Sequence, residues 1–518
     1  MSPQRDGIIL NSGEQWDEVK TGQDEESSFD GYFDPAWQPA WRPAWKRGSP
    51  ASHWRRKLGR LATSMGSVVR LLPAPEKLRP TAYLDGLRGF AALLVYWHHH
   101  QLWAHGSAGL NPLFENGFGY EGKHAWVALP FVRNFFTGGH FAVATFFVIS
   151  GYVLSLKPMG LIHARDLGRL GDTIASATFR RWPRLFVPII VVALSYALTW
   201  HMTGIWVNGA KPAGNWRDEV CAFYLEFKNF SFVYKEGGVP WLSYNFHLWS
   251  IPLEFRGSMV VYAVQLALSR SSQGARLLCQ AGLVAYFVFI ADGWFCAMFV
   301  QGMLLCDLDL LAHKGGKLPA FVARLEPVKD VVFAHLLVVA MYLGGIPSQN
   351  TEVSQLARNR GWYYLSLLKP QAVFDYKWFY LWIAATCLVI SVPRIPQLKG
   401  FFETRFCQFL GRVSFALYMV HGPVIWTVGD RLYAAAGWFT DEHTQHIPRW
   451  ADALRLPRKG PLGLEVSFLV PQLVLLPLTL LLAEVVTRAV DTPSVHFADW
   501  LYRRTLGPEP LPEKQAQA

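Results

Sequence analysis

Apolar residues gather in ten segments along the chain, and polar or basic stretches separate them. The segments lie near residues 86–104, 137–157, 184–203, 246–268, 276–291, 294–312, 330–346, 377–393, 409–428 and 465–490. Several approach the roughly 20 residues that an α-helix needs to cross a bilayer, whereas the fifth to eighth are shorter. The pattern predicts an all-α, polytopic membrane protein with about ten transmembrane helices.

Two segments with different patterns precede the first apolar one. Residues 1–52 contain the repeat PAWQPAWRPAW, in which a proline at every fourth position opposes both helix and sheet. We expect a disordered tail there, with a tryptophan-rich interfacial anchor as the alternative. Residues 53–79 carry apolar side chains at spacings of three and four, with basic residues mostly off that stripe. They predict a basic amphipathic juxtamembrane helix, unless the stripe packs on protein.

Composition and charge agree with a membrane protein. Hydrophobic residues make up 51% of the 518 and charged residues only 17%, against about 25% charged in soluble domains. The net charge of +11 would suit a nucleic-acid partner, but in an apolar chain it more often marks cytosolic loops. We therefore expect a membrane-lipid partner and no nucleic acid.

The placement of lysine and arginine predicts the topology. With ten spans both termini lie on one side, and the loops on that side are the more basic ones, although the opposite loop at 431–459 is basic too. Both termini are therefore predicted to be cytosolic, with the membrane domain over 80–500 and a cytosolic tail over 501–518. The pattern does not distinguish an endomembrane from the plasma membrane.

The six cysteines show neither CxxC nor cysteine–histidine spacing of the kind found in zinc sites. Four of them lie in or beside apolar segments. Neither a disulfide framework nor a metal site is expected.

The stretch LRGFAALLVYWHHH, residues 87–100, puts a cation and three histidines into one predicted span. A helix turns about 100° per residue, so Arg88 and His99 point within roughly 20° of each other. His98 and His100 point elsewhere: one is expected against neighbouring helices and the other near the outer interface. An ionisable group inside a membrane is costly, which makes His99 a functional candidate, with interhelical hydrogen bonding as the alternative.

The same predicted helix has two further features. Asp85 falls on the Arg88 stripe, one turn earlier. Gly89, Ala91 and Ala92 are small, so we expect a second helix to approach closely here.

Two other predicted helices carry polar stripes. His247, Ser250 and Glu254 share a face of the fourth helix, because seven steps return within about 20°. Glu254 could orient His99, pair with Arg88 or bind an acceptor. On the ninth helix His421 belongs to a stripe with Ser414 and Tyr418, and is either an acceptor contact or a structural hydrogen bonder. Near the chain end, Glu484 and Arg488 predict a structural i,i+4 pair, and residues 491–494 are expected to close the last helix.

Arg180, Arg181 and Arg184 lie within about one turn of one another, ahead of the third apolar segment. Pro183 is expected in the first turn of that helix, which would put these cations at a helix N-terminus, a favourable place for phosphate. The alternative is that they only anchor the cytosolic side.

Six motifs occur in order, and together they resemble the acyltransferase 3 family, membrane O-acyltransferases with ten spans. They are YLDGLRGFAALLVYWHH (83–99), FFVISGYVLS (146–155), FRRWPRLFVP (179–188), HLWSIPLEFRGS (247–258), LGRVSFALYMVHGPV (410–424) and AEVVTRAVDTPSV (483–495). The resemblance covers about residues 80–500. The sequence LEFRGS departs from bacterial members and is closer to the fungal branch.

The resemblance implies transfer of an acyl group, acetyl being the favoured case, from acyl-CoA to a hydroxyl of a lipid, glycan or small metabolite. Such transfer needs a base, and an imidazole with a reference pKa of about 6.5 suits that role. His99 is assigned as the base, with Glu254 and His421 as further catalytic candidates. Arg88, Arg180, Arg181 and Arg184 are assigned to the acyl-CoA phosphates, and no metal cofactor is expected.

Two other function classes compete with this interpretation. Intramembrane histidine, glutamate and arginine also serve proton-coupled transporters, but the inverted repeats that would favour transport are not found. A non-enzymatic scaffold or receptor would not need Arg88 and His99 on one helix face.

Overall fold

The computed structural model describes residues 78–234, 240–313, 319 and 326–507. Within these ranges every regular element is helical and no strand occurs, so the all-α prediction is confirmed for them. The expected tail at 1–52 lies outside the described residues, as does nearly all of the amphipathic segment at 53–79.

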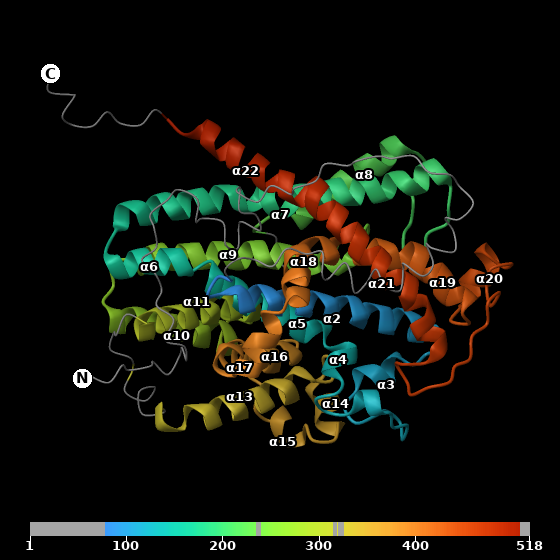
Figure 1. Cartoon of the computed structure of the whole chain (residues 1–518), viewed down its shortest axis with the longest axis horizontal. Helices are drawn as coiled ribbons and strands as arrows, with labels where there is room; N and C mark the ends of the chain where they lie inside the picture. The colour runs from blue at the N-terminus through green and yellow to red at the C-terminus, as the bar shows by residue number, and fades with distance from the viewer. Residues whose placement is uncertain (1–77, 235–239, 314–318, 320–325, 508–518) are drawn as a thin grey trace, which may run out of the picture.

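The longer helices form the body of the molecule and run mostly along its long axis (Figure 1). They are α2 (Ala82–Gly106), α5 (Gly139–Val153), α7 (Leu167–Thr203), α8 (Trp216–Phe230), α9 (Ser250–Ala267), α10 (Gln273–Phe289), α11 (Trp294–His313), α13 (Lys329–Gly344), α16 (Lys377–Ser391), α18 (Arg405–Val424), α21 (Val466–Val486) and α22 (Thr492–Thr505).

Shorter elements connect them. The short α-helices are α3 (Asn111–Glu115), α4 (Asn134–Thr137), α6 (Leu156–Ala164), α14 (Val353–Arg358), α15 (Tyr363–Ser366), α17 (Pro396–Phe402), α19 (Asp430–Ala435) and α20 (Asp441–His446). The 3-10 turns are η2 (Trp126–Ala128), η3 (Phe246–Trp249), η4 (Glu326–Val328) and η5 (Val392–Arg394), and the π-turns are η6 (Ile425–Gly429) and η7 (Thr487–Asp491).

Helix α2 lies in the middle of the bundle and packs on α18 and α5 (Figure 1). The contact with α18 is a backbone contact, because a Cβ atom on Gly89 would overlap the main chain of Leu410 and Gly411. The predicted close approach of a second helix is therefore confirmed at Gly89. It places Arg88, the residue before Gly89, directly against α18.

Helix α7 is longer than the apolar segment that predicted it. It begins at Leu167, where the Asp166 side chain accepts a hydrogen bond of 3.1 Å from the Arg169 N–H. Pro183 lies in the interior of the helix, so the prediction that it occupies the first turn is wrong. The apolar segment covers only the second half of α7, because its first turns are polar. Arg180, Arg181 and Arg184 consequently lie within a helix and not at its N-terminus.

Helix α21 does not end at the closing motif. It passes through the π-turn η7 directly into α22, so the expectation that residues 491–494 close the last helix is wrong. The predicted pair of Glu484 and Arg488 is present at 2.5 Å, and Arg412 of α18 joins it at 2.7 Å. The Arg412–Glu484 pair joins α18 to α21.

Four helical stretches of the described chain are long and apolar enough to cross a membrane. They are Gly139–Ala164, Leu167–Thr203, Trp294–Ala312 and Val466–Thr505. A fifth would be Lys377–Arg394 with Pro396–Phe402, if these two helices, bent by 96°, form one span. The expected ten spans are thus not confirmed. Helices α2 and α18 fall short because both carry histidine and charged side chains, which lower their hydropathy.

Candidate active site

Three histidines from separate elements converge in the interior. His99 comes from α2, His247 from η3 and His421 from α18. Their ring centroids are 4.2 Å (His99–His247), 4.8 Å (His247–His421) and 5.2 Å (His99–His421) apart. One nitrogen from each ring lies within 4.8 Å of the others. We call these three residues the histidine cluster.

Hydrogen bonds fix the tautomer of His247. The Asn245 Nδ2 group donates to the Met419 carbonyl at 2.9 Å, so its Oδ1 atom is the acceptor that faces His247 Nδ1 at 3.0 Å. The Nδ1 atom of His247 must therefore carry the proton. Its Nε2 atom keeps a free lone pair when the ring is neutral.

His421 is fixed in the same tautomer. Its Nδ1 atom lies 3.2 Å from the Leu417 carbonyl, which can only accept. The Nε2 atom of His421 is buried and has no hydrogen-bond partner among the described residues. Buried polar atoms without a partner are uncommon in native proteins, and each needs an explanation.

Close packing holds η3 against α18. A Cβ atom on Gly422 would lie 2.5 Å from Asn245 Oδ1 and 2.6 Å from His247 Nδ1, so only glycine leaves room there. The Tyr418 hydroxyl contacts Ser250 Oγ at 2.7 Å and also donates to the His247 carbonyl. The cluster is therefore built on a rigid support.

The other two histidines of the HHH run lie outside the cluster, although the His98 ring is 5.0 Å from the His99 ring. His98 packs on Gly139 and lies 5.6 Å, ring to ring, from His140 at the start of α5. His100 contacts the Tyr433 hydroxyl at 2.7 Å and is fully buried, so neither histidine lies at an exposed edge. Of the three histidines, only His99 faces α18. Arg88 also faces α18, and its Nη2 donates to the Gly411 carbonyl at 3.4 Å. The predicted helical phase is confirmed, and the role of His99 as base stays a prediction.

Glu254 lies in a buried ion pair with Arg181. The Arg181 Nη2 atom is 2.6 Å from Glu254 Oε1, and the Arg181 Nε group donates to Ser258 Oγ at 2.9 Å. Ser150 of α5 hydrogen-bonds the same carboxylate, and Arg88 interacts with it electrostatically. Of the alternatives open for Glu254, pairing with an arginine is the one the structure contains, but the direct partner is Arg181.

The other arginines also have acidic neighbours. Arg180 Nη1 lies 2.5 Å from Asp499 Oδ1. Arg184 interacts electrostatically with Asp491 and Asp499, and Asp491 with Arg88. The structure therefore brings all four predicted arginines into one network with Glu254, Asp491 and Asp499.

Sequence reasoning gave no role in the site to four residues of this region. Asn245 and His247 follow a loop, and only the shared face with Ser250 pointed to His247. Asp491 lies in the last of the six motifs, where the sequence predicts only the end of a helix. Nothing in the sequence marked Asp499, because its partner Arg180 is distant along the chain.

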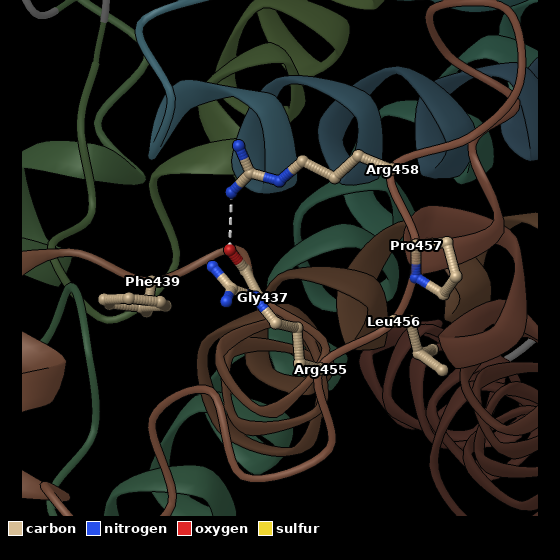
Figure 2. A pocket seen from close by; sticks show the side chains of 6 residues that line it. All are labelled: Gly437, Phe439, Arg455, Leu456, Pro457 and Arg458. Atoms are coloured by element: carbon tan, nitrogen blue, oxygen red, sulfur yellow. Dashed lines mark hydrogen bonds between the residues drawn. The ribbon is translucent and has the colours of Figure 1, made fainter.

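A cleft in the described part of the chain lies elsewhere. It measures about 550 Å³ and is lined by Gly437, Phe439, Arg455, Leu456, Pro457 and Arg458 (Figure 2). Arg458 donates to the Gly437 carbonyl at 2.6 Å and covers the Trp438 ring. No residue of the histidine cluster or the arginine network lines this cleft, so the candidate site is assigned from side-chain chemistry.

Comparison with known proteins identifies an acyltransferase family. A family model described as an acyltransferase domain, Acyl_transf_3, matches residues 81–487. The O-acetyltransferase PaAT-1 of Phomopsis amygdali is 29% identical over 477 residues, which cover 85% of this chain and 88% of that protein. The acyltransferase clz18 of Cochliobolus lunatus is 22% identical over 83% of this chain and 97% of its own length. No solved structure matches.

Proposed function

The chain belongs to the acyltransferase 3 family of membrane-embedded O-acyltransferases, and from this premise we propose its donor, acceptor and catalytic groups. The donor is acyl-CoA, with acetyl as the favoured acyl group. The acceptor is a hydroxyl of a lipid, glycan or small metabolite. The name of the relative PaAT-1, an O-acetyltransferase, supports acetyl.

The observation that carries the proposal is the convergence of His99, His247 and His421. The His99 imidazole takes the proton of the acceptor hydroxyl while the oxygen attacks the thioester carbonyl. The carbon–sulfur bond then breaks, and the CoA thiolate recovers the proton from His99. The products are an ester and CoA thiol, and base catalysis of this kind contributes about 10²–10⁴-fold in rate.

His247 and His421 support that step. Their Nδ1–H groups are held by Asn245 and Leu417, so each presents an unprotonated Nε2 atom. These lone pairs accept hydrogen bonds from the acceptor or from the His99 imidazolium once it forms. His421 is therefore an acceptor contact in this proposal, and His247 joins the site.

Arg88, Arg180, Arg181 and Arg184 hold the phosphates of the donor. Asp499, the partner of Arg180, has a side chain that is 33% exposed, whereas the Arg180 side chain is 8% exposed. A phosphate has more charge than a carboxylate and binds arginine through two parallel hydrogen bonds. The donor therefore displaces Asp499 from Arg180, while Arg181 keeps its more deeply buried pair with Glu254 and offers its remaining N–H donors to the phosphate.

Labelled acetyl-CoA tests the proposal directly. The purified full chain is incubated with it and with an extract of the native host, and labelled products are identified by mass spectrometry. We expect a labelled ester that the His99→Ala variant does not make. Solute uptake into proteoliposomes without any labelled ester would instead support the transporter interpretation.

A further inference from the structure

The spacing of the histidine cluster matches that of a three-histidine metal site. Zinc binds imidazole nitrogen at about 2.0–2.1 Å in tetrahedral geometry, which puts ligand ring centroids about 5 Å apart. The observed separations are 4.2, 4.8 and 5.2 Å. The ligand nitrogens lie within 4.8 Å of one another and would close to about 3.4 Å around the ion. Small side-chain rotations are enough for that change.

The hydrogen bonds around the cluster are those of a metal site as well. A histidine that binds a metal usually donates its other N–H to a carbonyl or carboxylate, which orients the ring. His247 donates to the Asn245 side chain and His421 to the Leu417 carbonyl. The buried Nε2 atom of His421 has no partner in the described part of the chain. Two neutral rings therefore carry free lone pairs in a cluster whose ligand nitrogens lie within 4.8 Å of one another, and such a cluster favours a cation.

We propose that His99, His247 and His421 bind one Zn²⁺ ion with an open fourth position, and that bound zinc inhibits acyl transfer. The binding follows from the geometry alone. The inhibition rests on the proposed function, because the His99 lone pair that takes the acceptor proton is bound to the metal when zinc is present. No metal was expected from the sequence because the cysteines lack metal-site spacing. Three histidines on separate elements form no motif along the chain, so the sequence could not indicate them.

Zinc binding is measured without turnover. The full chain is purified in detergent without a histidine tag, stripped with a chelator, titrated with Zn²⁺ and analysed for bound zinc after desalting. We expect one tightly bound ion per chain, and its loss in His247→Ala and in His421→Ala. The exposed His335 of α13 provides the matched control, and His335→Ala should bind zinc as the wild type does.

A milder variant protects this test against misfolding. Asn245→Ala keeps all three ligands and removes an orienting partner, so zinc affinity should fall about 10–100-fold. Equal zinc binding by the wild type and by all three site variants would overturn the site.

The inhibitory role has its own measurement. Zinc should slow wild-type turnover over the range in which it binds, compete with the acceptor rather than with acyl-CoA, and be reversed by chelation. Unchanged turnover at full occupancy would overturn the inhibition, and so would loss of turnover on chelation. If no acceptor is ever labelled, the proposed function fails while the zinc measurement still stands.

Discussion

The His99 ring stacks on the His421 ring at a centroid separation of 5.2 Å, and the two helices that carry them touch backbone to backbone at Gly89 and Gly411. Glycine has no side chain, so the two backbones are already in contact and the helices cannot come closer. The glycine contact therefore fixes how closely the two helices approach, at a point about 15 Å along α2 from His99. Changes at the glycines should alter the site without touching a histidine.

Gly89→Ala should lower both stability and turnover. The added methyl group would overlap the backbone of α18, which cannot rotate away, and such overpacking costs about 1–3 kcal/mol. Apparent melting temperature in detergent and turnover are measured for each variant. Gly171 of α7 is the control, because a Cβ atom there meets no atom within 4 Å. Gly171→Ala should gain up to about 1 kcal/mol from helix propensity, and equal behaviour of the two variants would contradict the glycine contact.

Helical periodicity predicted the part of the site that lies on one regular helix. The angle between Arg88 and His99 depends only on helix geometry, and both side chains face α18 as expected. Periodicity placed His247 on one face with Ser250 and Glu254, but it could not predict the contact with His99, because His247 lies in the 3-10 turn η3 and its orientation is set by Asn245 and Gly422. Which helices meet is decided by packing between distant segments, and periodicity carries no information on that.

Breaking the Arg181–Glu254 pair should be more damaging than removing it. Either single variant, Arg181→Met or Glu254→Leu, leaves a buried charge without its partner and should cost about 3–5 kcal/mol. The double variant should recover much of that loss. Apparent melting temperatures of the four proteins test this expectation, and additive losses would contradict it. Turnover of the double variant should stay at least 10-fold below wild type, and full turnover would make the pair purely structural.

Arg184→Ala should weaken acyl-CoA binding and leave acceptor binding nearly unchanged. Arg184 is a member of the arginine network that we assign to the donor phosphates. A filter-binding assay with labelled acyl-CoA measures the effect. Arg169→Ala on the same helix is the control, because the Arg169 side chain is 65% exposed and lies far along α7 from the network. Equal acyl-CoA affinity of the two variants would remove Arg184 from the donor site.

Both termini should lie in the cytosol. The basis is the excess of lysine and arginine on the loops of that side. Glycosylation acceptor sites added at each end are scored in cells, together with one placed in the basic loop at 431–459. We expect modification only in that loop. Modification at either terminus would overturn the ten-span topology.

Hydropathy alone undervalues the helices that carry the site. Helices α2 and α18 hold His99 and His421 together with Arg88 and Arg412, and neither ranks among the helices apolar enough to span a membrane. They tolerate these residues because other helices surround them. For α7 hydropathy gave the wrong boundary. Its apolar half suggested a start near Pro183, whereas Asp166 caps the helix several turns earlier. Segment boundaries depend on such caps and on neighbours.

The most direct test of the central claim is turnover of three alanine variants, His98→Ala, His99→Ala and His100→Ala, at matched expression. One acceptor is assayed at several acyl-CoA concentrations, with acyl-CoA binding measured in parallel. Because only the His99 ring lies in the histidine cluster, we predict that His99→Ala loses about 10²–10⁴-fold in turnover while it still binds acyl-CoA. His98→Ala and His100→Ala should lose far less, since the His98 ring packs on α5 and meets His99 only edge to face, and the His100 ring contacts Tyr433. Near-normal turnover of His99→Ala, with either neighbour inactive, would contradict the assignment of His99 as the base.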